Sequence, residues 1–110
     1  MTTALLIPCY NAERYLENLR RQVDALKPAF DEMVVVDDGS ADGTVARARE
    51  LGFDIKPLGA NRGPGAARNA AAKLATAEWL HFLDADDEVA PDYLAKVMPH
   101  APDECDVVLS

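Results

Sequence analysis

Apolar runs of strand length alternate with amphipathic segments along the whole chain. The apolar runs cover residues 4–8, 33–36, 53–58, 79–83 and 107–109. Helical segments are predicted between them, after residue 11 as far as Pro28 and over 44–51, 66–75 and 91–99. Because strands and helices alternate with connections long enough for crossovers, the pattern predicts an α/β fold. We expect a mostly parallel sheet with helices on both faces.

Capping residues mark the predicted ends of several helices. Asn11 is suited to be the N-cap of the first helix, and Pro28 is expected to end that helix. Gly52 suits the position that follows the second helix. Pro91 fits the first turn of the last helix, which Pro99 is expected to end.

Four successive strand runs are each followed by a polar or glycine-rich segment. These segments are residues 8–11, 37–40, 59–65 and 84–87. The carboxyl ends of parallel strands meet at one edge of the sheet, and ligands of open α/β sheets bind in the crevice there. The sequence therefore predicts a ligand site at this edge.

Length and charge narrow the classes of function. With 110 residues, 49% of them hydrophobic, the chain suits one domain with one core. The net charge of −8 argues against non-specific binding to nucleic acid or to an anionic membrane, because both require a basic surface.

The cysteines and the amino-terminal residues indicate in which cellular compartment the protein is expected. Cys9 and Cys105 form neither a disulfide framework nor a metal-ligand spacing, which favours a reducing environment. The sequence contains no signal-peptide pattern and no apolar run of membrane-spanning length. We therefore expect a cytoplasmic location, with membrane association only through sequence that is not present here.

The fourth strand run ends in a dense acidic segment, with Asp84, Asp86, Asp87 and Glu88. Alternate residues of a strand project to the same side, so Asp84 and Asp86 can face one cation. Mg²⁺ takes oxygen ligands and is usually bound by one or two carboxylates together with substrate phosphates. The segment is a candidate metal site, and a solvated turn before a helix is the alternative.

Two other strand ends offer groups that suit a nucleotide. Asp37 or Asp38 can accept hydrogen bonds from a base or a ribose, although an Asx turn with Gly39 explains them equally well. Tyr10 offers an aromatic face for stacking on a base, or it covers the edge of the core.

The glycine-rich loop 59–65 precedes an alanine-rich helix. Free backbone N–H groups and the helix dipole favour an anion at such a helix start, and Arg62 and Arg68 add positive charge. The spacing matches neither usual nucleotide-binding glycine motif. A turn followed by a closely packed helix explains the glycines and alanines, but it does not explain the arginines.

Nucleophilic catalysis has little support in the sequence. His81 lies within an apolar strand and is predicted to be a partly buried core residue. No Ser-His-Asp arrangement and no activated cysteine is evident in the sequence.

Taken together in order, the motifs resemble glycosyltransferase family 2. The segments that carry the resemblance are Ile7-Pro8-Cys9-Tyr10-Asn11 with Glu13, Val35-Val36-Asp37-Asp38-Gly39-Ser40 with Asp42-Gly43-Thr44, Asn61-Arg62-Gly63 with Ala67-Arg68-Asn69, and Phe82-Leu83-Asp84-Ala85-Asp86-Asp87 with Pro91-Asp92-Tyr93-Leu94. They span essentially the whole chain. The resemblance implies a GT-A fold, with a Rossmann-like nucleotide-binding half, and a hexosyltransferase that transfers a sugar from a nucleotide-sugar donor with inversion.

The resemblance also implies roles at the nucleotide end of the site. Pro8 and Tyr10 would line the pocket for the base, and Glu13 belongs to the same nucleotide-binding motif. Asp38 would bind the base, which is typically uracil, so a UDP-sugar is the expected donor.

Further roles are implied at the other end of the site. Arg68 would lie near the donor, Asp84 would face the ribose or the sugar, and Asp86 would hold Mn²⁺ or Mg²⁺ on the diphosphate. The metal would neutralise charge on the leaving nucleotide diphosphate as the sugar carbon becomes cationic.

One departure from the family concerns the acceptor. The family supplies its acceptor platform and catalytic base after the fifth strand, beyond Ser110 in this numbering. Residues 1–110 are therefore expected to be the donor-binding part of a truncated domain. We expect this part to bind nucleotide weakly with metal and to be inactive in transfer, and the acceptor is open among saccharide, lipid and protein.

Three alternatives stay open on the sequence alone. The first is a non-catalytic nucleotide-binding module. The second is a receiver-like Mg²⁺-binding phosphoacceptor domain, although a strand precedes the acidic pair and no Lys follows the fifth strand. The third is a nucleotidyltransferase, although its glycine-rich, basic signature after the first strand is missing.

Overall fold

The computed structural model describes residues 2–97 and 107–109, which form one five-stranded sheet. The strands are β1 (Thr3–Cys9), β2 (Glu32–Asp37), β3 (Ile55–Pro57), β4 (Trp79–Phe82) and β5 (Val107–Leu109). Their order is β3-β2-β1-β4-β5, and every neighbouring pair is parallel. The predicted α/β fold with a parallel sheet is confirmed.

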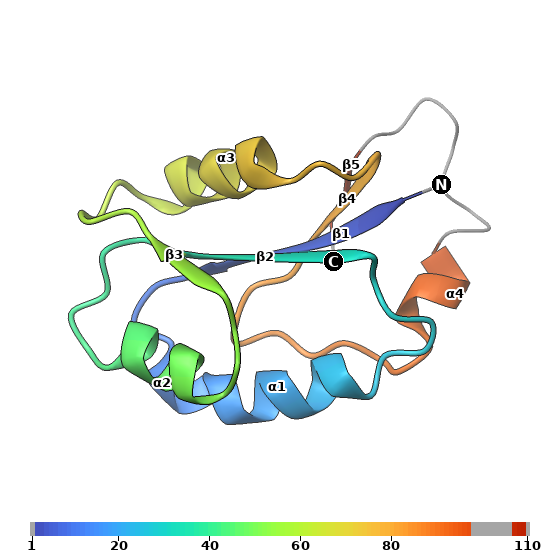
Figure 1. The fold of residues 1–110 in the computed structure, drawn as a ribbon, viewed down its shortest axis with the longest axis horizontal. Coiled ribbons are helices and arrows are strands. Elements are labelled where there is room, and N and C mark those ends of the chain that lie inside the picture. The colour runs from blue at the N-terminus through green and yellow to red at the C-terminus, as the bar shows by residue number, and fades with distance from the viewer. Residues whose placement is uncertain (1, 98–106, 110) are drawn as a thin grey trace.

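Helices cover both faces of the sheet (Figure 1). They are the short 3-10 helix η1 (Glu13–Tyr15), α1 (Leu16–Asp24), α2 (Thr44–Glu50), α3 (Pro64–Leu74) and α4 (Tyr93–Val97). Figure 1 shows α1 and α2 on one face and α3 on the opposite face. No helix within the described residues combines the length and apolar character that a membrane crossing requires.

The central strand β1 is buried on both sides, and alternate residues supply two separate cores. Leu5, Ile7 and Cys9 belong to the core under α1 and α2. Ala4 and Leu6 belong to the core under α3. This division follows from the two-residue period of a strand and explains why the run is apolar at consecutive positions.

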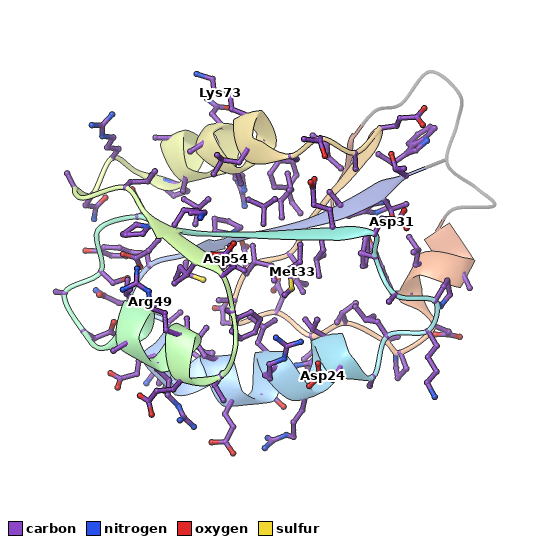
Figure 2. All side chains as sticks on the ribbon, in the orientation of Figure 1. Asp24, Asp31, Met33, Arg49, Asp54 and Lys73 are labelled. Carbon is purple, nitrogen blue, oxygen red and sulfur yellow. The ribbon has the colours of Figure 1, made fainter. Side chains whose placement is uncertain are left out.

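The alanines of α3 allow the helix to lie close to the sheet. Ala67 and Ala71 are almost completely buried, at 1% and 0% exposure, against Val34 and Val36 of β2. Charged side chains such as Lys73 lie on the outer side of this helix, as Figure 2 shows. The small side chains therefore bring the start of α3 close to the carboxyl end of β2.

Three predicted helix boundaries are wrong. Pro91 does not lie in the first turn of the last helix, because it is in a turn that precedes α4, which begins at Tyr93. Asn11 does not act as an N-cap, because its backbone has φ +49° and its side-chain Oδ1 accepts the backbone N–H of Ala41 at 2.8 Å. The first helix ends at Asp24, before Pro28, and is followed by a non-helical segment. Asn tolerates the left-handed conformation, and its side chain is used here to join two loops. Pro99 lies outside the described residues.

The strand order creates a crevice at the carboxyl edge. The chain passes from β1 outward to β2 and β3, and then returns through α3 to β4 on the other side of β1. Such a reversal between β1 and β4 is the point at which open α/β sheets bind ligands. The same order disagrees with a receiver domain, whose strands follow the order 2-1-3-4-5.

Candidate functional site

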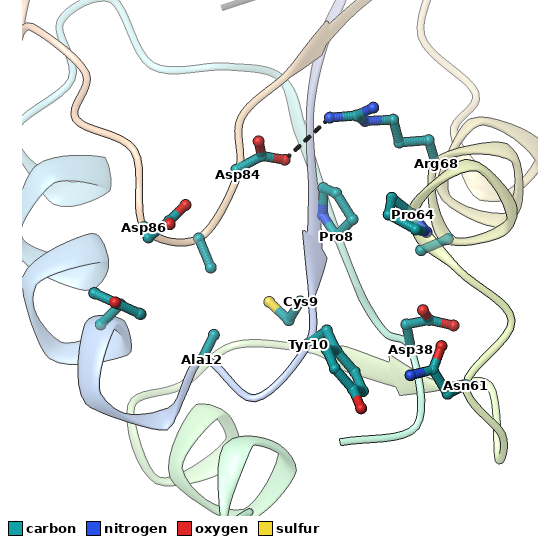
Figure 3. A pocket seen from close by; sticks show the side chains of 13 residues that line it. Pro8, Cys9, Tyr10, Ala12, Asp38, Asn61, Pro64, Arg68, Asp84 and Asp86 are labelled. Atoms are coloured by element: carbon teal, nitrogen blue, oxygen red, sulfur yellow. Dashed lines mark hydrogen bonds and ion pairs between the residues drawn. The ribbon is translucent and has the colours of Figure 1, made fainter. Parts of the chain in front are cut away.

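A pocket of about 560 Å³ opens at this reversal. Its walls come from the end of β1, the residue after β2, the loop before α3, the first turns of α3 and the turn after β4 (Figure 3). The predicted site residues that line it are Pro8, Tyr10, Asp38, Arg68, Asp84 and Asp86. The fold therefore brings together residues that lie up to 78 positions apart in the sequence.

Glu13 is the predicted site residue that does not line this pocket. Its carboxylate Oε1 accepts the backbone N–H of Gly43 at 3.1 Å, just before α2 begins. The Glu13 backbone N–H in turn faces Asp42 Oδ2 at 3.4 Å. Glu13 thus joins the start of η1 to the start of α2, and its assignment to the nucleotide site stays a prediction.

Acidic groups gather on the β4 side of the pocket. Carboxylate oxygens of Asp84, Asp86 and Asp87 lie within 4.8 Å of one another. A tight turn brings them together, because the backbone N–H of Asp87 donates to the carbonyl of Asp84 at 3.0 Å. Such a set of oxygens suits a hard divalent cation. Alternation along the strand predicted that Asp84 and Asp86 face one cation, and the family resemblance implied that Asp86 holds the metal; neither gave Asp87 a role of its own.

Arg68 reaches this acidic cluster from α3. Its Nη2 donates to Asp84 Oδ1 at 3.3 Å, and the two side chains are about half exposed. The Arg68 Nε is buried and has no hydrogen-bond partner within the described part of the chain. The side chain as a whole is partly exposed, and a guanidinium beside a candidate cation site is suited to bind a phosphate group.

The opposite end of the pocket combines an aromatic face with a buried carboxylate. Tyr10 is 50% exposed, whereas Asp38 is 3% exposed. Figure 3 shows Tyr10, Asp38 and Asn61 side by side at this end. Asn61 belongs to a motif that carries the family resemblance, but it was not predicted to be a site residue, because its side chain carries no charge.

The Asp38 carboxylate is already engaged by the loop before α3. Its Oδ1 accepts the backbone N–H of Arg62 at 2.8 Å, and its Oδ2 accepts that of Gly63 at 3.0 Å. Each carboxylate oxygen can accept more than one hydrogen bond, so Asp38 keeps capacity for a donor on a ligand.

Gly39 lets this loop approach. Its φ is +73°, and a Cβ there would lie 2.4 Å from the backbone nitrogen of Asn61. Any side chain at position 39 would therefore push the loop away from Asp38.

Cys9 lines the pocket but is not an activated nucleophile. The residue is 2% exposed, and burial, together with the negative charge of Asp37, raises the pKa of its thiol to about 12. The thiol is therefore protonated at neutral pH, and the thiolate is the reactive form. Cys105 lies outside the described residues.

His81 is a core residue, as predicted, but it is completely buried where partial burial was expected. Its ring packs edge-on against Phe30 and Tyr93, with centroids 5.2 Å and 6.0 Å away. Burial lowers the pKa of His81, which favours the neutral ring. It does not line the pocket.

Comparison with known proteins identifies the family. The protein-family model described as Glycosyl transferase family 2 matches residues 4–110. The chain belongs to glycosyltransferase family 2. The resemblance drawn from the ordered motifs is thereby confirmed.

Two curated relatives illustrate the extent of the similarity. The succinoglycan biosynthesis protein ExoO of Rhizobium meliloti (strain 1021) is 45% identical over 99 residues, which is 87% of this chain and 28% of the relative. An uncharacterized glycosyltransferase, alr2836, of Nostoc sp. is 39% identical over 103 residues, or 89% of this chain and 32% of the relative. The chain spans about a third of the length of the curated relatives it matches.

Solved structures of this glycosyltransferase fold include ligand complexes. Staphylococcus aureus TarS 1–349 in complex with UDP is 34% identical, with a TM-score of 0.75 over 90% of this chain and 31% of that chain. The mannosyltransferase PcManGT of Pyrobaculum calidifontis, in complex with GDP-Man and Mn²⁺, is 27% identical, with a TM-score of 0.76 over 84% of this chain and 32% of that chain. The GT-A fold is thus shared with transferases that bind nucleotide-sugars.

Proposed function

We propose that this chain forms the donor-binding part of an inverting, metal-dependent glycosyltransferase that uses a UDP-sugar. The observation that carries the proposal is the pocket itself, which has the aromatic ring of Tyr10 and the carboxylate of Asp38 at one end and the carboxylates of Asp84 and Asp86 at the other. The similar proteins TarS, in complex with UDP, and PcManGT, in complex with GDP-Man and Mn²⁺, support the class of ligand.

The base would occupy the end of the pocket formed by Pro8, Tyr10, Asp38 and Asn61. The exposed ring of Tyr10 offers a face for stacking, and stacking is tolerant of base identity. Selectivity would come from Asp38, because a carboxylate accepts the ring N–H of uracil but repels the unprotonated ring nitrogen of cytosine.

The diphosphate would occupy the acidic end. The fit of a divalent cation rests on the close carboxylate oxygens of Asp84, Asp86 and Asp87, which match the oxygen preference of Mg²⁺ and Mn²⁺. A bound cation supplies charge neutralisation for the diphosphate leaving group. Arg68, which lines the pocket with a partly exposed side chain, would orient the same group.

Neither the residues that would bind the acceptor nor the general base that would deprotonate its hydroxyl is assigned within this chain. The pocket contains a protonated, buried thiol at Cys9, and no histidine of the described residues lines it. We propose that this chain binds donor weakly and that transfer requires the acceptor-binding part of a longer protein.

The test is a calorimetric titration with UDP, with and without Mn²⁺, that compares the wild type with Asp86→Asn. We expect Mn²⁺-dependent binding in the wild type and its loss in the variant. Glu88→Gln is the matched control, because it removes the same charge from an exposed neighbour outside the close oxygen set. Equal binding by the wild type and Asp86→Asn, in folded samples, would reject the metal site.

A further inference from the structure

The two ends of the pocket are connected through the protein by one short path that starts at Asp38. The backbone N–H of Asp38 donates to the carbonyl of Cys9 at 2.8 Å, which fixes Asp38 against the end of β1. Its carboxylate then accepts the N–H groups of Arg62 and Gly63. The buried carboxylate therefore sets where the loop lies relative to the sheet.

Gly63 connects the loop that Asp38 binds to the start of α3. Its N–H is bound by Asp38 and also by Asn61 Oδ1 at 3.1 Å, and its carbonyl accepts the N–H of Ala67 in the first turn of the helix. Gly63 has φ +98° and is the residue at which the chain turns into α3. Gly63 is thus bonded to Asp38 and Asn61 through its N–H and to the first turn of α3 through its carbonyl.

Arg68 is the residue after Ala67, and its Nη2 pairs with Asp84 at the acidic end. A displacement of the 61–63 loop moves the start of α3 and with it the guanidinium. The loop also has little room to move toward the strand end, since a Cβ at Gly39 would meet the backbones of Ala60 and Asn61 at 2.5 Å and 2.4 Å.

We propose that Asp38 is a positioning residue for the diphosphate end of the pocket, in addition to the base contact proposed above. It acts through the 61–63 loop and α3 on the Arg68–Asp84 pair, so a group bound to Asp38 and a group bound at Arg68 are energetically coupled. The inference rests on the proposed function for the identity of the ligand, but its geometry concerns this chain alone.

The decisive ligand is inorganic pyrophosphate with Mn²⁺, because it has no base and cannot touch Asp38 through one. In Asp38→Asn the side-chain amide keeps one acceptor and presents a donor to the other backbone N–H, so the loop loses one anchor. We expect a loss of pyrophosphate affinity of at least about fivefold, the lower end of typical couplings between linked sites. Gly39→Ala, which displaces the loop but keeps the carboxylate, is expected to act in the same direction.

Asp37→Asn is the matched control. Asp37 is the neighbouring buried aspartate, at 2% exposure, but its carboxylate binds the backbone and hydroxyl of Ser40 in a different loop. We expect its affinity for pyrophosphate to match that of the wild type. An equal loss in Asp37→Asn, or unchanged pyrophosphate binding in Asp38→Asn while uridine binding falls, overturns the inference.

A double-mutant cycle separates positioning from a general loosening of the fold. If Asp38 acts through Arg68, Arg68→Lys and the Asp38→Asn/Arg68→Lys double variant have nearly equal affinity for pyrophosphate. If the affinity losses of Asp38→Asn and Arg68→Lys add up in the double variant, Asp38 does not act through Arg68.

A ligand-free measurement distinguishes failure of this inference from failure of the proposed function. The Nε–Hε NMR signal of Arg68 is expected to shift in Asp38→Asn, whereas that of Arg20, which pairs with Asp24 on α1, is expected to stay in place. A shift in a protein that binds no nucleotide would support the path and refute the donor site. An unmoved Arg68 signal would refute the path whatever the ligand.

Discussion

Two acidic regions follow strands at the same edge of the sheet, yet they are built in opposite ways. The Asp37–Asp38 pair is buried, at 2% and 3% exposure, and its oxygens bind the backbone of two loops. In the Asp84–Asp87 cluster, defined as Asp84, Asp86 and Asp87, Asp86 is exposed. Within the described residues the carboxylates of Asp86 and Asp87 accept no hydrogen bond.

The difference lies in what approaches each region. Gly39 and the 60–63 loop close over the first pair, so its carboxylates substitute for water as partners of backbone N–H groups. The turn after β4 leaves Asp86 exposed, and the close oxygens of the second set are a candidate site for a cation. One region therefore stabilises the fold of the site, and the other is available to a ligand.

The largest expected difference between the two acidic regions is in the free energy of unfolding. Asp38→Ala leaves the N–H of Arg62 without its acceptor and leaves the N–H of Gly63 with Asn61 Oδ1 alone, so we expect the free energy of unfolding to fall by about 2 kcal/mol. Asp86→Ala removes an exposed group and is expected to change it by no more than about 0.5 kcal/mol. Urea denaturation without metal measures both, and equal losses would erase the distinction between the two regions.

A second prediction concerns Mn²⁺ without nucleotide. A cation that binds only the folded state stabilises it, by about 1.4 kcal/mol at a tenfold excess over its Kd. We expect thermal unfolding to shift upward with Mn²⁺ in the wild type and in Glu88→Gln, but not in Asp86→Ala. The same shift in Asp86→Ala would indicate that the cation binds elsewhere, and K⁺ at equal ionic strength controls for screening.

The sequence predicted the sheet and the edge at which the site lies, because both depend on short-range patterns. Strand runs, their order along the chain and the polar segments after them are visible without tertiary contacts. The strand limits shifted by a few residues, as in the third strand, which is Ile55–Pro57 where residues 53–58 were expected.

The sequence could not separate the roles of its carboxylates. Asp38 and Asp86 are both strand-end aspartates, and only the approach of the 60–63 loop tells them apart. Asn11 and Glu13 were likewise predicted from local helix rules and motif position, whereas their side chains bind the backbones of Ala41 and Gly43 in a loop about 30 residues away. Long-range contacts of this kind leave no local signature.

The smallest predicted effect concerns Glu32, whose carboxylate, like that of Asp38, accepts hydrogen bonds from the backbone of a distant segment. The backbone N–H of Thr76 donates to Glu32 Oε1 at 2.8 Å, and this bond outweighs partial desolvation and lowers the pKa of Glu32 below its usual 4.5. A lowered folded pKa stabilises the fold above the unfolded pKa, and that stabilisation is lost as the pH falls through the folded value. We therefore expect Glu32→Gln to be slightly less stable than the wild type at neutral pH, with the difference vanishing on acidification below about pH 4.5. Urea denaturation across that range measures it, with the exposed neighbour Glu78→Gln as control; a difference that persists unchanged into acid would show that Glu32 contributes through packing and not through its charge.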